Sequence, residues 1–262
     1  MKRILTLILA AAALFSCLML NGCAKADPYE EKTAGFQLEK PAKGDEIAVM
    51  KTTLGDIYIR FFPEGAPKAV ENFISLAKKG YYNDRLFFRV DKDFCAQSGD
   101  PKNDGTGGAS IWETPFEDEF SNKLFNLKGS LAMANSDVNT NGSQFFFNLA
   151  PADLLAKWIN AAKSEYERIE DVTNLTNWKQ LLNGVVASDA EKIPDDVLDL
   201  YAKTGGSPDL DGAWRATGGH TVFGQVYDGL AVLDKINEVK VKGEKPVTDV
   251  KIISITFKAY AG

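Results

Sequence analysis

The chain has a single histidine, His220, and only three cysteines, Cys17, Cys23 and Cys95. No two cysteines have the C-x-x-C spacing, and one imidazole is too few for a histidine-rich metal site. Neither a metal nor another cofactor is therefore expected. Basic residues are also in deficit, with 30 Lys and Arg against 36 Asp and Glu and a formal net charge of −6. Nucleic acid is not an expected partner, because phosphates repel a chain of this sign.

The N-terminus instead carries a long apolar run. Two basic residues precede residues 4–20, which are almost entirely apolar, and the string LNGC follows at residues 20–23. A charged start, a short apolar core and a small residue before the cleavage point are the parts of a secretory signal peptide. The string LNGC resembles the bacterial lipobox, in which cleavage precedes a cysteine that then carries lipid. We therefore expect a lipoprotein signal peptide at residues 1–22 and lipidation of Cys23.

This N-terminus predicts an extracytoplasmic protein anchored to the bacterial membrane through Cys23, because two or more acyl chains give stable anchoring. The alternative is a plain secretory signal with an incidental cysteine. Cys17 leaves with the signal, so Cys95 is expected to form no intramolecular disulfide. Residues 23–44 are interpreted as the lipidated cysteine and a polar tether. An ordered arm that packs on the domain remains the alternative, since the segment contains two apolar residues, Phe36 and Leu38.

Residues 45–262 predict one mainly β domain. A turn at 53–56 joins two strand patterns into a hairpin, and a helix begins at Pro67 and ends before Gly80. The loop at 100–110 is rich in glycine but lacks the Lys and the Ser or Thr that end a phosphate-binding loop. The expected strands cover residues 46–52, 57–61, 221–226 and 247–257, and a short helix covers 230–236.

Residues 152–209 differ from their surroundings, because apolar residues there recur at helical spacing. Three sets are recognisable, at 154–162, 178–185 and 197–201, and the string GGSP at 205–208 ends the block. We predict an α-helical insertion at about 152–209 whose tryptophans and leucines serve helix packing.

Three strings in the β-rich part resemble one family. FFRV at 87–90 with FCAQSGD at 94–100, LAMAN at 131–135 with NTNGSQFF at 139–146, and GHTVFG at 219–224 resemble signature segments of the cyclophilin-type peptidyl-prolyl cis/trans isomerases. The likeness covers about residues 46–150 and 210–258. It implies a closed eight-stranded antiparallel barrel capped by two helices, with the helical insertion in a surface loop, where insertions are tolerated.

The resemblance implies an active site centred on Arg89. Rotation about an X–Pro bond needs a pocket for proline and a donor that favours the twisted amide, and Arg89 is expected to be that donor. Gln97 is expected to hold the guanidinium and to contact the substrate backbone. His220 is expected to be a pocket wall and not a titrating base. The other implied binding residues are Phe94, Cys95 (where the family usually has methionine) and Phe146 as walls, Ala134 and Asn135 through backbone groups, and Gln144 through its side chain.

Two alternatives remain open at this stage. The family usually places a tryptophan and a leucine shortly before the histidine, whereas this chain has extra residues there, so either Leu210 or Trp214 completes the pocket. That departure puts cyclosporin sensitivity in doubt. The expected partners are proline-containing unfolded or partly folded polypeptides, and a monomer is expected. The alternative function is a non-catalytic, peptide-binding chaperone lipoprotein that uses the helical insertion.

Overall fold

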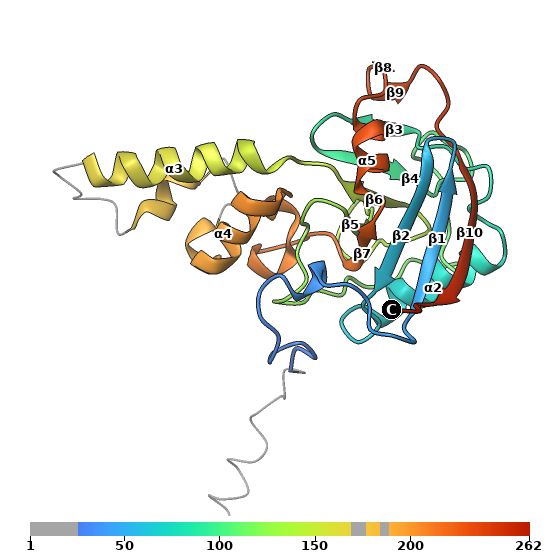
Figure 1. Cartoon of the computed structure of the whole chain (residues 1–262), viewed down its shortest axis with the longest axis horizontal. Coiled ribbons are helices and arrows are strands. Elements are labelled where there is room, and N and C mark those ends of the chain that lie inside the picture. The colour runs from blue at the N-terminus through green and yellow to red at the C-terminus, as the bar shows by residue number, and fades with distance from the viewer. Residues whose placement is uncertain (1–25, 169–176, 184–188) are drawn as a thin grey trace, which may run out of the picture.

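A computed structural model describes residues 26–168, 177–183 and 189–262. Eight strands form one curled antiparallel sheet in the order β10-β1-β2-β7-β5-β6-β4-β3, and β8 and β9 form a separate hairpin (Figure 1). The strands are β1 Glu46–Thr52, β2 Gly55–Phe61, β3 Arg89–Asp91, β4 Cys95–Ser98, β5 Ser130–Met133, β6 Phe145–Asn148, β7 Val222–Asp228, β8 Val241–Lys242, β9 Lys245–Pro246 and β10 Ile252–Ala259. The α-helices in these residues are α2 Pro67–Lys78, α3 Ala152–Arg168, α4 Asp195–Thr204 and α5 Leu230–Asn237.

The expected closed barrel is not confirmed, because the sheet is a half-barrel whose outer strands β3 and β10 do not form a continuous ladder. The segment before β3 meets the start of β10 through one isolated bridge, Leu86 to Lys251. Single backbone bonds flank it, such as Phe87 N to Val250 O at 2.9 Å. Asp84 has a positive φ of 61°, so the chain turns here and does not extend as a strand.

Helices α2 and α5 cover the apolar interior of the sheet, as the two-helix expectation required. Phe73 of α2 lies at the centre, with its ring centroid 5.0 Å from Tyr82, 5.2 Å from Phe145 and 5.4 Å from Phe223. All four rings are almost completely buried. Burial of each large apolar side chain stabilises the fold by about 1.5–3 kcal/mol, so this cluster fixes how α2 sits on the sheet.

Two predicted elements are corrected in detail. The last strand begins at Ile252 and not at Val247, because Val247 N donates back to Lys240 O at 2.8 Å and closes a loop after the β8–β9 hairpin. The apolar set at 178–185 forms a 3-10 helix over Trp178–Leu182 that Asn177 caps. The remainder of that set lies outside the described residues, apart from position 183.

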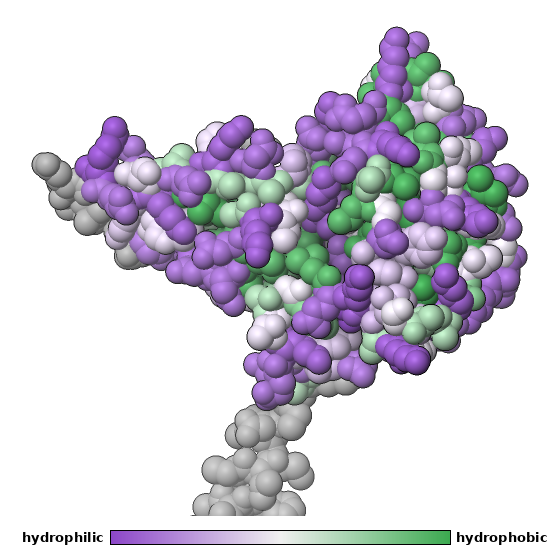
Figure 2. All heavy atoms as spheres, viewed as in Figure 1, coloured by the Kyte–Doolittle hydropathy of each residue, from purple (hydrophilic) through white to green (hydrophobic). Residues whose placement is uncertain are grey.

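The helical insertion forms a lobe beside the sheet, with its own apolar core (Figure 1). Phe125 and Leu127 from the β-rich part join this core, so the lobe is tied to the domain by packing. Its visible surface is mostly polar, and apolar residues gather where it meets the sheet (Figure 2). Trp158 is an exception to the predicted packing role, because it is 48% exposed. The buried residues contributed by the lobe are Leu155, Ile159, Ala162, Leu182, Ala190, Ile193, Val197, Leu198 and Tyr201.

From residue 26 onward the segment interpreted as a tether packs on the domain, and the ordered arm is the arrangement observed. Tyr29 and Phe36 lie against Phe62, with ring centroids 6.3 and 5.7 Å from it. Gln37 is fully buried: its Nε2 donates to Phe125 O at 2.9 Å, and its Oε1 accepts from Phe125 N at 2.7 Å. The arm therefore bridges the sheet and the base of the helical lobe. Cys17 and Cys23 lie outside the described residues.

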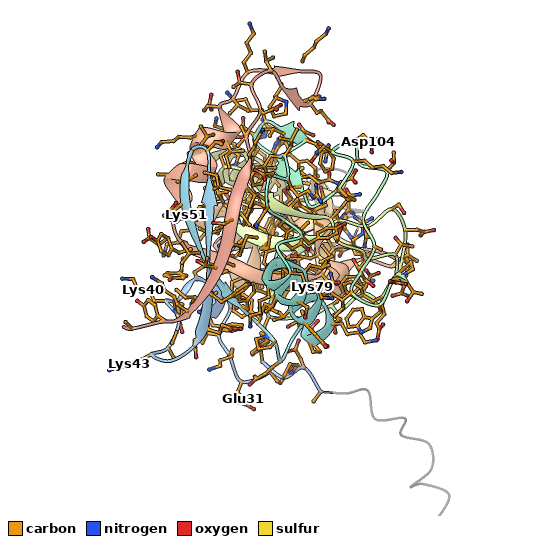
Figure 3. The ribbon with its side chains drawn as sticks, turned by 90° about the vertical axis from the view of Figure 1, so that its right-hand side faces the viewer. Glu31, Lys40, Lys43, Lys51, Lys79 and Asp104 are labelled. Carbon is orange, nitrogen blue, oxygen red and sulfur yellow. The ribbon has the colours of Figure 1, made fainter. Side chains whose placement is uncertain are left out.

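Several charged side chains lie at the periphery of the domain. Lys40, Lys43, Lys51, Lys79 and Asp104 project outward from the arm, the β1–β2 hairpin, the end of α2 and the loop after β4 (Figure 3). In the part of the chain that the structure describes, no helix combines the length and the apolar character needed to cross a membrane.

Candidate active site

One small pocket gathers nearly all the residues that the sequence predicted. Its volume is about 130 Å³. Of the predicted side chains, Gln144 and Trp214 do not line it. The lining residues are Arg89, Phe94, Cys95, Gln97, Ala134, Asn135, Phe146, Leu210 and His220.

Strand register explains how distant residues meet here. Arg89 of β3 pairs with Gln97 of β4, and Gln97 pairs in turn with Phe146 of β6. Residues directly opposite one another in neighbouring strands project from the same face of a sheet. Arg89, Gln97 and Phe146 therefore form one row across three strands. It lies on the face opposite the main apolar core, which their strand neighbours Val90, Ala96 and Phe147 enter.

The Arg89 guanidinium is held by two carboxylates. Its Nε and Nη2 donate to the carboxylate of Glu244 at 2.7 and 3.1 Å, and Nη2 also donates to Asp91 at 3.0 Å. The amide of Gln97 instead donates to Gln144 Oε1 at 2.8 Å. The prediction that Gln97 holds the guanidinium is therefore wrong. Asp91 and Glu244 perform that role.

Arg89 and Glu244 stabilise each other's charged form. The hydrogen bond to Glu244 raises the pKa of Arg89 and, reciprocally, lowers the pKa of Glu244. Arg89 also lies over the ring of Phe94, with its Cζ 5.7 Å from the centroid. The pocket therefore contains one permanent cation at its rim, in contact with an aromatic wall.

The other walls are apolar or neutral. Cys95 is 2% exposed, and burial raises the pKa of its thiol to about 12, so it serves as a small apolar wall and not as a nucleophile. Burial lowers the pKa of His220, whose Nδ1 donates to Met133 O at 3.0 Å. The His220 ring packs edge-on against Phe146 at 5.3 Å. His220 thus lies where a pocket wall was expected.

Leu210, and not Trp214, completes the pocket. Leu210 lines it, and its carbonyl accepts from His220 N at 2.9 Å, which keeps the two wall residues together. Trp214 stacks on Phe125, 6.5 Å between centroids, and packs with the core of the helical lobe. The extra residues after Leu210 thus carry Trp214 away from the pocket.

A second, larger hollow of about 460 Å³ adjoins the pocket and shares Gln97, Ala134 and Asn135 with it. Gln144 lines this hollow, where its Nε2 donates to the carbonyls of Gly105 and Gly107 at 3.1 and 2.7 Å. The Ala134 N–H donates to Gln144 O at 3.0 Å, so that amide is already engaged within the fold.

A buried carboxylate behind the pocket was missed from the sequence. Asp211 accepts from the backbone N and the Nδ2 of Asn126 at 2.8 and 3.0 Å, and from the hydroxyl of Tyr201 at 2.6 Å. Burial raises its pKa to about 7. Tyr201 belongs to α4, so this cluster joins the helical lobe directly to the residue that follows Leu210. The local signal in the sequence is the position of Asp211, directly after Leu210. An acidic side chain next to a pocket residue can hydrogen-bond the polar groups around the pocket.

Comparisons with known proteins match most of the chain. Residues 47–257 match the family model described as cyclophilin type peptidyl-prolyl cis-trans isomerase/CLD. A protein of Staphylococcus saprophyticus named as a peptidyl-prolyl cis-trans isomerase is 39% identical over 224 residues, which cover 84% of this chain and 95% of that protein. A similarly named protein of Staphylococcus haemolyticus is 42% identical over 221 residues, with the same two coverages.

Among solved structures, a cyclophilin type peptidyl-prolyl cis-trans isomerase of Cryptosporidium parvum shares the fold, with a TM-score of 0.57 and 24% identity. The likeness covers 82% of this chain and 98% of that one. A second structure of that protein, in the presence of the dipeptide Ala-Pro, gives a TM-score of 0.56. The family match spans most of the chain, and the curated relatives match at about 40% identity. The chain belongs to the cyclophilin type peptidyl-prolyl cis-trans isomerases.

Proposed function

We propose that this isomerase binds the proline of an X–Pro bond in the pocket that Arg89 flanks, and that Arg89 promotes rotation of the bond. The observation that carries the proposal is the pocket itself, with one fixed cation beside otherwise apolar and neutral walls. A pyrrolidine ring is small and apolar, so Phe94, Cys95, Phe146 and Leu210 offer it a matching surface.

The chemistry follows from the amide bond. An X–Pro bond rotates over tens to hundreds of seconds, because rotation removes amide conjugation across a barrier of about 18–20 kcal/mol. In the twisted amide the proline nitrogen is pyramidal and regains its lone pair. An N–H of Arg89 aimed at this nitrogen stabilises the twisted state more than either planar state, which lowers the barrier. No proton transfer is needed, which suits a His220 that stays neutral.

The catalytic proposal is tested by exchange NMR on a peptide with one X–Pro bond. Catalytic amounts of the protein without residues 1–23 are expected to raise the cis–trans exchange rate in proportion to enzyme concentration. The chaperone alternative predicts binding of an unfolded, proline-containing polypeptide with no increase in exchange. Absence of acceleration at any enzyme concentration would refute the catalytic proposal, and binding under those conditions would support the alternative.

We further propose that the enzyme acts on exported proteins from a lipid anchor on Cys23. The proposal rests on the apolar run and the LNGC string at the N-terminus. In a bacterial host grown with labelled palmitate, the full chain is expected to incorporate label and sediment with membranes. Cys23→Ser is expected to lose the label, while Cys95→Ser, the matched control, keeps it. Equal labelling of the Cys23→Ser and wild-type chains would exclude Cys23 as the lipid site.

A further inference from the structure

The five N–H donors of Arg89 are divided unequally between two sides of the guanidinium. The Nε–H and both N–H groups of Nη2 face carboxylates, those of Glu244 and Asp91, at 2.7 to 3.1 Å. Nη1 donates to the sulfur of Cys95 at 3.1 Å, and a thiol is a weak acceptor. Among the described residues, every strong acceptor of Arg89 thus lies on the Nε and Nη2 side. Nη1, beside the pocket wall Cys95, is the end left for a substrate.

Glu244 is itself fixed relative to the strand that carries Arg89. It occupies the two-residue turn between β8 and β9, after Gly243, whose φ of 65° glycine adopts without strain. The carbonyl of Glu244 accepts from Val90 N at 2.7 Å, next to Arg89 in β3. Figure 1 shows the hairpin beside β3 at one end of the sheet. Glu244 is therefore joined to β3 twice, by a backbone bond to Val90 and by a side-chain pair with Arg89, which is 155 positions away.

We propose that Glu244 is a positioning residue, which locks the guanidinium of Arg89 with Nη1 toward the proline nitrogen. Asp91 shares the task from the same strand. The inference deepens the proposed function and rests on it. A long arginine side chain that is 30% exposed samples several rotamers unless it is paired in two places. Stabilisation of a twisted amide depends on the donor already pointing at the nitrogen, so a fixed guanidinium raises the rate.

Glu244 also has an opposite effect, because its negative charge partly offsets the positive charge that Arg89 presents to the substrate. The Glu244 side chain is 51% exposed, so water screens its charge. Its two directional hydrogen bonds depend on contact geometry and are screened less. The positioning effect therefore exceeds the loss of charge, and removal of Glu244 is expected to slow the enzyme.

The test compares Glu244→Ala and Glu244→Gln with wild type by exchange NMR of an X–Pro peptide. Glu244→Ala is expected to lower kcat/KM by about 5- to 10-fold, mainly through kcat. Glu244→Gln keeps one carbonyl acceptor and is expected to fall between. The ¹⁵N–¹H signal of Arg89 Nε is a second readout: it is expected to shift and broaden in Glu244→Ala as the side chain is released. Glu238→Ala is the matched control, since Glu238 is a 64% exposed partner of Lys92 at 2.9 Å.

The outcomes separate this inference from the proposed function. An inactive wild type refutes the proposed function, and the Arg89 signal still reports whether Glu244 holds the guanidinium. An active wild type with Glu244→Ala as fast as Glu238→Ala, or faster than wild type, overturns the positioning role. Slower catalysis with an unchanged Arg89 signal overturns it as well. Slower catalysis together with a released Arg89 supports it.

Discussion

Arg89→Ala is expected to lower kcat/KM for an X–Pro peptide by about 100- to 1000-fold, the usual loss when one fixed donor to a transition state is removed. The apolar walls remain, so the substrate still binds and the loss falls mainly on kcat. The measurement is exchange NMR under the conditions used for wild type, with both constants determined.

Two further variants make this result specific. Arg89→Lys keeps the charge but loses the planar fork that Glu244 and Asp91 hold, so its activity is expected between wild type and Arg89→Ala. Arg168→Ala is the matched control, because Arg168 is an exposed arginine on α3 paired with Glu165 at 2.8 Å. An Arg89→Ala enzyme within threefold of wild type would show that rotation is catalysed without this cation.

Stability is expected to fall as pH rises from about 4 to about 7, through Asp211. Burial raises the pKa of this carboxyl from 3.8 to about 7. Over that interval the folded protein keeps a proton that the unfolded chain has released, so rising pH favours unfolding. The contribution is complete below pH 4 and lost above pH 7, and the shift from 3.8 to about 7 corresponds to about 4 kcal/mol. Urea unfolding at a series of pH values measures it.

Asp211→Asn isolates this contribution from those of other carboxylates. The amide can still accept from Asn126 but cannot ionise, so its free energy of unfolding relative to wild type is expected to increase between pH 4 and pH 7. Asp199→Asn, on the exposed side of α4 and 3.5 Å from Lys163, is the control expected to run parallel to wild type. A constant difference between Asp211→Asn and wild type at all pH values would show that Asp211 does not titrate in this range.

Local patterns predicted many of the helices and strands, and the family resemblance predicted most of the pocket. The hairpin of β1 and β2, the start of α2 at Pro67 and the helix α5 follow from turn chemistry and apolar spacing. The residues of the pocket came from the resemblance of short contiguous strings to a known family, and not from periodicity or propensity. Those strings also assigned Leu210 and Trp214 only as alternatives, since the length of an insertion does not tell which residue stays at the pocket.

Sequence patterns did not predict the contacts between segments that are far apart in the chain. Glu244 reaches Arg89 across 155 positions through a tight turn that carries no motif. The three hydrogen bonds of Asp211 depend on where the helical lobe docks, and the burial of Gln37 depends on an arm whose composition is that of a linker. In each case a polar residue is placed by tertiary packing, which propensity and periodicity do not report.

The packed arm determines how far the enzyme can reach. If Cys23 carries the lipid as proposed, only residues 24 and 25 separate it from the described arm, a span of about 10 Å at full extension. A free segment from 23 to 44 could instead extend about 70 Å. With so short a linker, the domain would stay next to the membrane surface and could not move far from it. Under the proposed anchoring, its substrates are expected to be X–Pro segments of chains that lie close to the bilayer.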